Sequence, residues 1–342
     1  MTLLFFDGFQ DAVLMPKEGW GGSIGTVGTG RDGSTNGSAG MTTTARTYNL
    51  PGSGAATCVC GFAMLPNSFA LGTGVPQFSM YTSGIVRQLT IMINSSGFIE
   101  ARKGTNTGTL LGTSSGHTAI ALNDWPHIQV KALLHLTTGS VQVKLYDITV
   151  LTVSGVSTST VTGSVTQVGF LCAQGNAIRV DDLYICDIVD ATGTQGQPNN
   201  DFLGDLKVAT LFPSAAGDST NFTPSTGTNF GAVDETPPNT TDYVSSSNSN
   251  DLDLYQTADP ASTVGTVFAV QQSLYASKSD AGVAPLKPAL KENSTVTLDS
   301  SVGLAFGSWV TYWGQMRAVR PSDSALWTAT DINNLQIGQK IA

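Results

Sequence analysis

Four aspartates offer the best candidate for specific chemistry in this 342-residue sequence. Asp181, Asp182 and Asp187 fall beside one predicted strand near the end of the first half, and Asp7 follows a short apolar run at the start. If the first and last strands of that half pair, the four carboxylates come together, and carboxylate oxygens are the ligands that calcium prefers. Calcium is therefore the one cofactor for which the sequence offers ligands. The alternative is that these aspartates are ordinary strand-end and turn residues.

The three histidines do not indicate a catalytic set. His127 and His135 lie on the same side of a predicted strand as Gln129, so we expect both side chains to face solvent. His117 lies in the turn-like segment SSGHTA. No Gly-x-Ser-x-Gly elbow or phosphate-binding loop accompanies any of them, so the sequence predicts no active site.

The four cysteines lack the spacing of zinc ligands. Cys58 and Cys60 are only two residues apart on what is predicted to be one strand face, and Cys172 and Cys186 are distant in sequence. Four buried free thiols are the favoured interpretation, with a disulfide as the alternative.

The composition excludes two classes of partner. A net charge of −9 and a sequence pI near 4.6, with no cluster of Lys and Arg, argue against a nucleic-acid-binding surface. No apolar run approaches the ~18 residues that cross a bilayer, and the N-terminal residues lack the basic leader of a signal peptide. We therefore expect no nucleic acid partner and no membrane insertion.

The residues that could carry chemistry stand on predicted strands. Residues 55–65 are apolar throughout, as in a buried strand, and residues 87–104 and 125–147 each alternate apolar and polar side chains around a Gly-containing turn. This alternation is typical of antiparallel sheets with one buried face, so we predict an all-β fold built from β-sandwich domains of the jelly-roll type.

A Gly-, Pro- and Asn-rich break divides the chain. The segment ATGTQGQPNN, residues 191–200, predicts a linker between a first domain over residues 1–190 and a second over residues 201–342.

One short helix is predicted near the C-terminus, over residues 328–337. Thr328 and Asp331 have the spacing of a capping box, Trp327 precedes them as a hydrophobic staple would, and Gly338 is placed to end the helix. We expect this helix to cover the open end of a sandwich, and a docking role for a partner is the alternative.

Two family resemblances follow from these segments. FFDGF, WPHIQVKALL with VQVKLYDITV, and IRVDDLYICD resemble strands of concanavalin A-like jelly rolls of the laminin-G kind. FLGDLKVATLFP, DLDLY, ASKSDAG and RPSDSALWTATDINNLQIGQKI resemble a segment recurrent in structural proteins of tailed bacteriophages and prophages. The second resemblance implies a place in the virion.

Jelly rolls of the first kind include enzymes, but their motifs are absent. The Glu-x-Asp-x-Glu pattern of laminarinase-type glucanases does not occur, nor do the Gln-Ile-His and Tyr-x-Lys-x-Gly-x-Tyr motifs of jelly-roll polysaccharide lyases. We therefore predict a protein that is not an enzyme.

The leading hypothesis is a structural virion component in the tail or its fibres, with capsid decoration as an unranked possibility. Its partners would be copies of itself and other virion proteins. The rival hypothesis is a lectin-like module for host surface glycans, in which Trp20 and Tyr81 stack on sugars from loops. Each of these two aromatics has the alternative role of anchoring its own loop.

Self-assembly is predicted to use the second domain. The polar stretch near residues 214–250 and its flanks carry five widely spaced aromatic residues that would be suitable interface anchors. They are Phe212, Phe222, Phe230, Tyr243 and Tyr255. The alternative is that these rings fold back on their own domain.

Overall fold

The computed structural model describes most of the chain, in two compact units. The residues outside the description are 1–2, 10–19, 22–26, 34–37, 41–45, 68–76, 162, 172–177, 189–200, 236–237, 261–263 and 284. The first unit extends to Val208 and the second runs from Ala209 to the C-terminus. The first unit therefore includes eight residues that follow the linker expected from the sequence.

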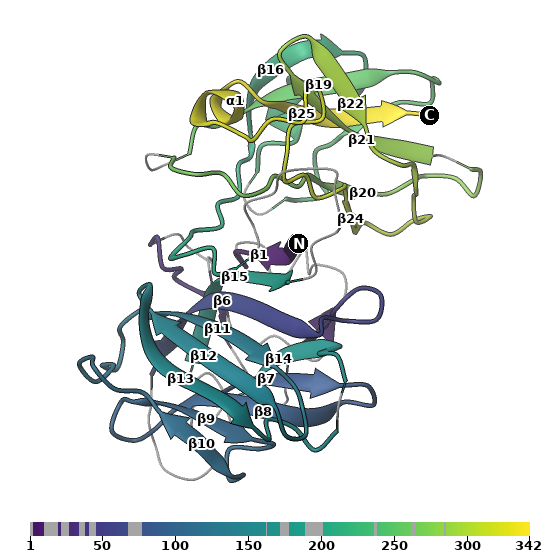
Figure 1. Cartoon of the computed structure of the whole chain (residues 1–342). Coiled ribbons are helices and arrows are strands. Elements are labelled where there is room, and N and C mark those ends of the chain that lie inside the picture. The colour runs from purple at the N-terminus through teal and green to yellow at the C-terminus, as the bar shows by residue number, and fades with distance from the viewer. Residues whose placement is uncertain are drawn as a thin grey trace. The chain divides into compact units, whose positions relative to one another are not determined.

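The first unit is a sandwich of two antiparallel sheets (Figure 1). The eight-stranded sheet has the order β13 (Ile148–Val156), β12 (Gly139–Leu145), β11 (His127–Leu133), β6 (Thr57–Pro66), β15 (Ile178–Asp187), β4 (Ser38–Gly40), β3 (Val27–Gly28), and β1 (Leu3–Asp7) also pairs with β15. The seven-stranded sheet has the order β10 (Leu110–Thr113), β9 (Ile99–Lys103), β8 (Val86–Ile93), β7 (Gln77–Thr82), β14 (Gln167–Leu171), β5 (Arg46–Asn49), β2 (Trp20–Gly21).

The alternating pattern of the sequence builds this sandwich. In β12 the apolar residues Val141, Val143 and Leu145 are buried, while the polar residues between them are only half-buried. The hairpins predicted over residues 87–104 and 125–147 are confirmed as β8–β9 and β11–β12.

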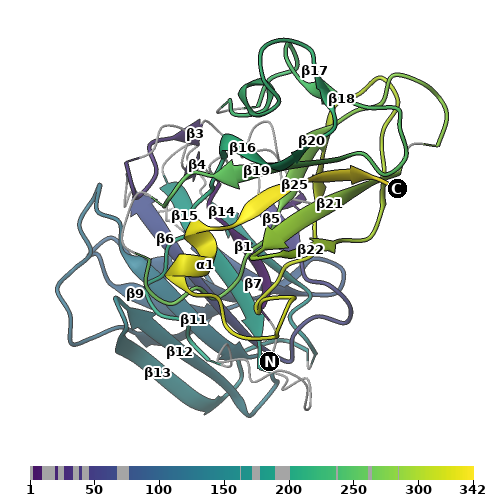
Figure 2. The ribbon, with the colours of Figure 1, turned by 90° about the horizontal axis from the view of Figure 1, so that it is seen from above.

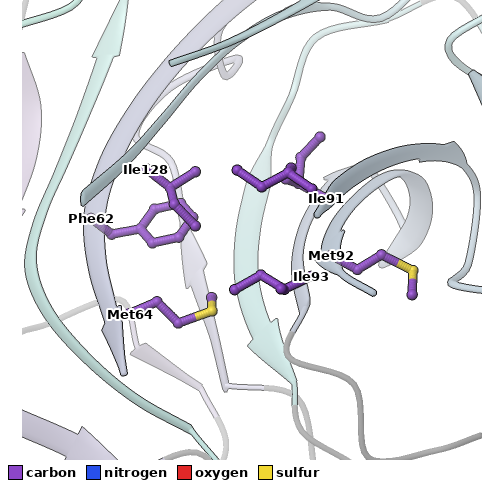
Figure 3. A pocket seen from close by; sticks show the side chains of 7 residues that line it. Phe62, Met64, Ile91, Met92, Ile93 and Ile128 are labelled. Carbon is purple, nitrogen blue, oxygen red and sulfur yellow. The ribbon is translucent and has the colours of Figure 1, made fainter. Parts of the chain in front are cut away.

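Apolar side chains from the two sheets meet in the core of the first unit (Figure 3). Phe62 and Met64 of β6 face Ile91 and Ile93 of β8, whereas Met92 points to the opposite side of its strand. The pocket drawn there is lined only by apolar residues, so it offers no group for acid-base or metal chemistry.

Nearly all regular elements of the second unit are also β-strands. Its main antiparallel sheet has the order β16 (Pro213–Thr220), β19 (Leu252–Thr257), β25 (Gln336–Ile341), β21 (Pro285–Glu292), β22 (Thr295–Leu298), with β23 (Val302–Gly303) paired to β21. Two small sheets pair β17 (Thr223–Pro224) with β18 (Val244–Ser245) and β20 (Ser273–Ala276) with β24 (Val310–Trp313). A 3-10 turn, η1 (Phe230–Ala232), and one helix, α1 (Ala329–Asn333), complete the described elements. The predicted all-β fold class with a short C-terminal helix is confirmed.

The capping box that predicted this helix is present. The Asp331 amide donates to Thr328 Oγ1 at 3.2 Å, and the Thr328 amide donates to Asp331 Oδ2 at 2.8 Å. The buried Trp327 and Ile332 belong to one apolar cluster, as a hydrophobic staple requires.

The predicted C-terminal end of the helix is wrong. The helix ends at Asn333, and Gly338 lies inside β25 between β19 and β21. A Cβ on Gly338 would lie 1.9 Å from the Asp253 carbonyl oxygen, so this glycine serves close strand packing and not a helix terminus.

Removing the cap should destabilise the second unit. Thr328→Ala is expected to lower the free energy of unfolding by about 1 kcal/mol, because the Asp331 amide loses its acceptor. Urea unfolding measures the loss. Thr330→Ala, at an exposed position two residues further on in the same helix, is the matched control, and an equal loss in both variants would contradict the capping role.

The predicted interface aromatics of this unit separate into two groups. Phe222 and Tyr255 are buried within the unit, with 7% and 3% of their surfaces exposed, so the prediction that they anchor an interface is wrong. Tyr243 is 40% exposed, whereas Phe212 and Phe230 are half-buried.

Among the described residues, no helix is long and apolar enough to cross a membrane.

Candidate functional site

A group of interacting polar and titratable side chains lies on the outer face of the eight-stranded sheet of the first unit. We call it the polar cluster, and its members are Arg31, His127, Gln129, Asp147, Asp181, Asp182, Tyr184 and Asp205. Strands β11 and β15 position most of these residues, because their core-facing neighbours, such as Ile128 and Ile185, fix the opposite direction for them. Residues 201–208, which we call the covering segment, bond to this cluster.

An amide and a phenol tie the covering segment to the sheet. Tyr184 Oη donates to Gln129 Oε1 at 2.8 Å, and Gln129 Nε2 donates to Asp147 Oδ1 at 2.7 Å. The amides of Leu203 and Gly204 donate to Tyr184 Oη at 3.1 Å and to Gln129 Oε1 at 3.0 Å. These side chains therefore act as backbone acceptors for a segment that lies outside any strand.

A glycine makes room for the phenol ring. Gly61 of β6 pairs with Tyr184, and a Cβ there would lie 2.0 Å from Tyr184 Cε1. Burial raises the pKa of the Tyr184 phenol well above its usual value, so it is a neutral donor and acceptor at physiological pH.

Arg31 supplies the positive charge that pairs with carboxylates of the polar cluster. Its guanidinium pairs with Asp205 at 2.6 Å and with Asp182 at 3.4 Å, and it also donates to the Leu206 carbonyl oxygen at 3.3 Å. The Val208 amide donates to Asp182 Oδ1 at 2.7 Å. Both ends of the covering segment are thus held by side chains of the sheet and of the turn that carries Arg31.

A β-bulge places two carboxylates side by side. The pairing of β15 with β6 shifts register between Asp181 and Tyr184, and Asp182 has a left-handed φ of 53°. Burial, and then the neighbouring Asp182 charge, raise the pKa of Asp181 to about 8. Burial also raises the pKa of Asp182 to about 6, against the opposing effects of the Val208 amide and Arg31. Asp181 accepts from the amides of Arg31 and Asp182, so its oxygens serve the backbone.

His127 is buried beneath the covering segment, so the prediction that it faces solvent is wrong. Its exposed fraction is 0%, and neither ring nitrogen has a hydrogen-bond partner among the described residues. The nearest carboxylate oxygen is Asp205 Oδ1, 3.9 Å from Nδ1. Burial lowers the pKa of His127 to about 4; the Asp205 charge opposes the shift and Arg31 adds to it. The imidazole is therefore neutral at pH 7.

This burial predicts a pH-dependent stability. A histidine whose pKa is depressed by folding stabilises the fold above about pH 6.5, and that stability is lost as the pH falls toward 4. His127→Phe should therefore lose less stability than the natural chain between pH 7 and pH 5, by about 2 kcal/mol. Asp181 and Asp182, whose raised pKa values favour folding at low pH, act equally in both proteins.

Hydrogen-exchange mass spectrometry of β11 peptides at both pH values gives the comparison. His135→Phe is the control, because His135 is half-exposed and accepts from the Thr137 and Thr138 amides. If the protection of β11 peptides falls between pH 7 and pH 5 by as much in His127→Phe as in the natural chain, the buried neutral imidazole is contradicted.

One serine–histidine pair has the distance of a nucleophile and a base. Ser114 Oγ lies 2.7 Å from His117 Nε2, and His117 Nδ1 lies 2.6 Å from the Thr118 carbonyl oxygen. Ser114 is only 5% exposed, however, and its oxygen accepts from the Ile99 amide at 2.9 Å. The arrangement supports a turn next to β9 and β10 more directly than it supports catalysis.

The four aspartates expected to bind calcium do not come together. β1 pairs with β15 as expected, but the Asp7 carboxylate accepts from the Phe9 amide at 2.8 Å and from Trp20 Nε1 at 3.0 Å. Asp187 lies at the end of β15, opposite Cys58. Within the described part of the chain, no three His, Cys, Asp or Glu residues are arranged to hold a metal ion.

The two aromatics expected to stack on a glycan from loops lie on strands instead. Tyr81 belongs to β7 and is 3% exposed, so the prediction that it offers a free ring face is wrong. Trp20 belongs to β2, and its ring packs against Phe5, Phe9 and Tyr48 at 5.7–6.0 Å, with the Arg46 guanidinium 4.8 Å from the ring centre. Both residues anchor the first unit.

Three of the four cysteines are buried free thiols, as the favoured interpretation predicts. They are Cys58, Cys60 and Cys186, and the sulfur atoms of Cys58 and Cys60 lie 3.5 Å apart. Cys172 lies outside the described residues.

Comparison with known proteins identifies no family. No family model matches the sequence, and no curated protein matches it. Among solved structures, domain 4 of an arabinanase from Geobacillus stearothermophilus is 14% identical with a TM-score of 0.37, covering 54% of this chain and 91% of that one. An endo-β-1,4-glucuronan lyase from Trichoderma reesei is 12% identical with a TM-score of 0.37, covering 54% and 96%. The carbohydrate-binding module CBM66 from Bacillus subtilis is 13% identical with a TM-score of 0.30, covering 50% and 93%.

Proposed function

We propose that this chain is a non-enzymatic structural protein of a tailed-bacteriophage virion, associated with the tail or its fibres. The observation that carries the proposal is that side chains of the polar cluster bind the backbone of the covering segment. A general acid or base needs a proton-transfer atom within reach of a substrate, whereas here the Asp182, Gln129 and Tyr184 oxygens accept backbone amides of the covering segment. The cluster thus fastens the chain, and the resemblance of residues 200–342 to phage structural proteins supports the location.

The location is tested on purified particles. Gold-labelled antibodies against this protein should bind intact virions at a fixed position, and mass spectrometry of gradient-purified virions should find several copies per particle. Detection of the protein only in the soluble fraction of the lysate would contradict a structural role.

The absence of catalysis is tested on pure protein with capsule and lipopolysaccharide. We expect neither reducing ends nor unsaturated sugars to be released. Release that is abolished by His117→Ala would instead assign chemistry to the pair formed with Ser114.

Carbohydrate recognition is a second candidate and is compatible with a place in the virion. One observation favours it: the second unit carries aromatic side chains that are partly exposed and that contact one another, namely Tyr243, Tyr275 and Trp309. Contiguous accessible aromatic rings, unlike single ones, are a feature of binding surfaces. Binding of glycans by the intact chain on an array tests this candidate.

A further inference from the structure

Three aromatic rings from three separate segments meet on the second unit. The Trp309 ring centre lies 5.9 Å from that of Tyr243 and 5.5 Å from that of Tyr275. Tyr243 directly precedes β18, Tyr275 lies in β20 and Trp309 directly precedes β24. Figure 2 labels β18 and β20, and Figure 1 labels β24. We call these three residues the aromatic wall.

Backbone hydrogen bonds hold each part of the aromatic wall. The Ser225 amide donates to the Tyr243 carbonyl oxygen at 2.8 Å, and the Tyr243 amide donates to Ser225 Oγ at 3.0 Å. Tyr275 pairs with Thr311 in the β20–β24 sheet, which fixes the strand that follows Trp309. The rings are therefore placed before any ligand arrives, which reduces the entropy lost on binding.

The aromatic wall is accessible and its close sequence neighbours are polar. Tyr243 is 40% exposed, and Trp309 and Tyr275 are half-buried. Two exposed serines lie next to the wall: Ser225, whose Oγ accepts from the Tyr243 amide, and Ser308, which precedes Trp309 in the chain. A surface of ring faces beside hydroxyl groups matches a sugar, which presents an apolar C–H face and a rim of hydroxyls.

We propose that the aromatic wall binds an uncharged carbohydrate, with a sugar ring stacked on Trp309 and its hydroxyl groups bonded to the neighbouring serines. The proposal rests on carbohydrate recognition as a function of this chain and gives it a place in the second unit.

The charges near the aromatic wall favour an uncharged sugar over an acidic one. Asp242 precedes Tyr243, and a hydrogen bond from Asn239 lowers the pKa of its carboxyl group, so it is ionised at neutral pH. A uronic or sialic acid carboxylate bound beside Tyr243 would thus be repelled by the Asp242 carboxylate.

Titration of the full-length protein with maltohexaose, cellohexaose and chitotetraose, followed by calorimetry, tests the proposal. At least one of these uncharged oligosaccharides should bind, and Trp309→Ala should weaken its binding about tenfold, equivalent to about 1.4 kcal/mol. Trp309→Phe should keep most of the affinity, because it retains a ring face. Tyr146→Ala is the matched control, since Tyr146 is 41% exposed but lies in the first unit. Circular dichroism checks that each variant is folded.

The outcomes separate the wall from the wider function. Binding that is unchanged in both Trp309→Ala and Tyr243→Ala would overturn the aromatic wall while leaving carbohydrate recognition in place. No binding of any glycan by the intact chain would overturn both. Self-association that is lost in Trp309→Ala, seen by sedimentation, together with no sugar binding, would assign the wall to contacts between copies and overturn the proposal.

Discussion

Replacing Arg31 by methionine is expected to destabilise the first unit by roughly 2–3 kcal/mol, which is below the range for a fully buried pair because Arg31 is partly exposed. The substitution removes the cation that faces the nearly buried Asp182 and leaves Asp205 without its ion pair. It also removes the contact with the Leu206 carbonyl oxygen, so the covering segment should loosen. Urea unfolding measures the first effect, and the rate of tryptic cleavage after Lys207 measures the second.

A second substitution separates charge from packing. Asp182→Asn in the Arg31→Met background should restore part of the lost stability, because no uncompensated carboxylate remains at that position. Arg87→Met is the matched control, since Arg87 donates to Gln77 Oε1 at 3.3 Å and forms no ion pair with any described residue. Equal unfolding midpoints for Arg31→Met and the natural chain, with equal cleavage rates, would show that the cluster does not hold the segment.

Gly61→Ala is expected to destabilise the first unit by about 1–3 kcal/mol, as insertion of a methyl group into a packed site does. The new Cβ would overlap the Tyr184 ring, which must move and give up its bonds to Gln129 and to the Leu203 amide. Thermal unfolding and hydrogen exchange of the Leu203 and Gly204 amides should both report the change.

A glycine in open space provides the comparison for this variant. A Cβ on Gly163, in the same unit, would contact only Thr82 Cγ2 at 3.9 Å, so Gly163→Ala should leave stability nearly unchanged. If Gly61→Ala also leaves stability and exchange unchanged, Tyr184 does not carry the covering segment.

The sequence predicts the sandwich well because its evidence is local. The alternation of apolar and polar residues over 125–147 indicates which side chains are buried. The register of β11 with β12 follows from the turn between them. The capping box at Thr328 is equally local and is found as predicted. The helix after it is shorter than expected because pairing of β25 with two neighbouring strands outweighs the local preference of residues 336–338.

The candidate sites depend on contacts that no local pattern contains. Alternation correctly places His127 and Gln129 on the outer face of the sheet, but their burial comes from a segment some seventy-five residues later, which covers that face. Trp20 and Tyr81 have loop-like neighbours in sequence, yet strand pairing draws both into the body of the first unit. Tyr243 was among the aromatics predicted to lie at an interface, whereas nothing in the sequence brings Tyr275 and Trp309 beside it.

The covering segment also restricts the position at which the first unit can be joined to a different second module. An exchange of modules at the Gly- and Pro-rich residues 191–200 would give the first unit a foreign continuation in place of residues 201–208. Tyr184, Gln129 and Asp182 would then lose the backbone amides of Leu203, Gly204 and Val208 that bond to them, at a cost of about 1 kcal/mol for each hydrogen bond. Viable chimeras should therefore inherit their junction after Val208, so that the first module travels together with the eight residues that cover it.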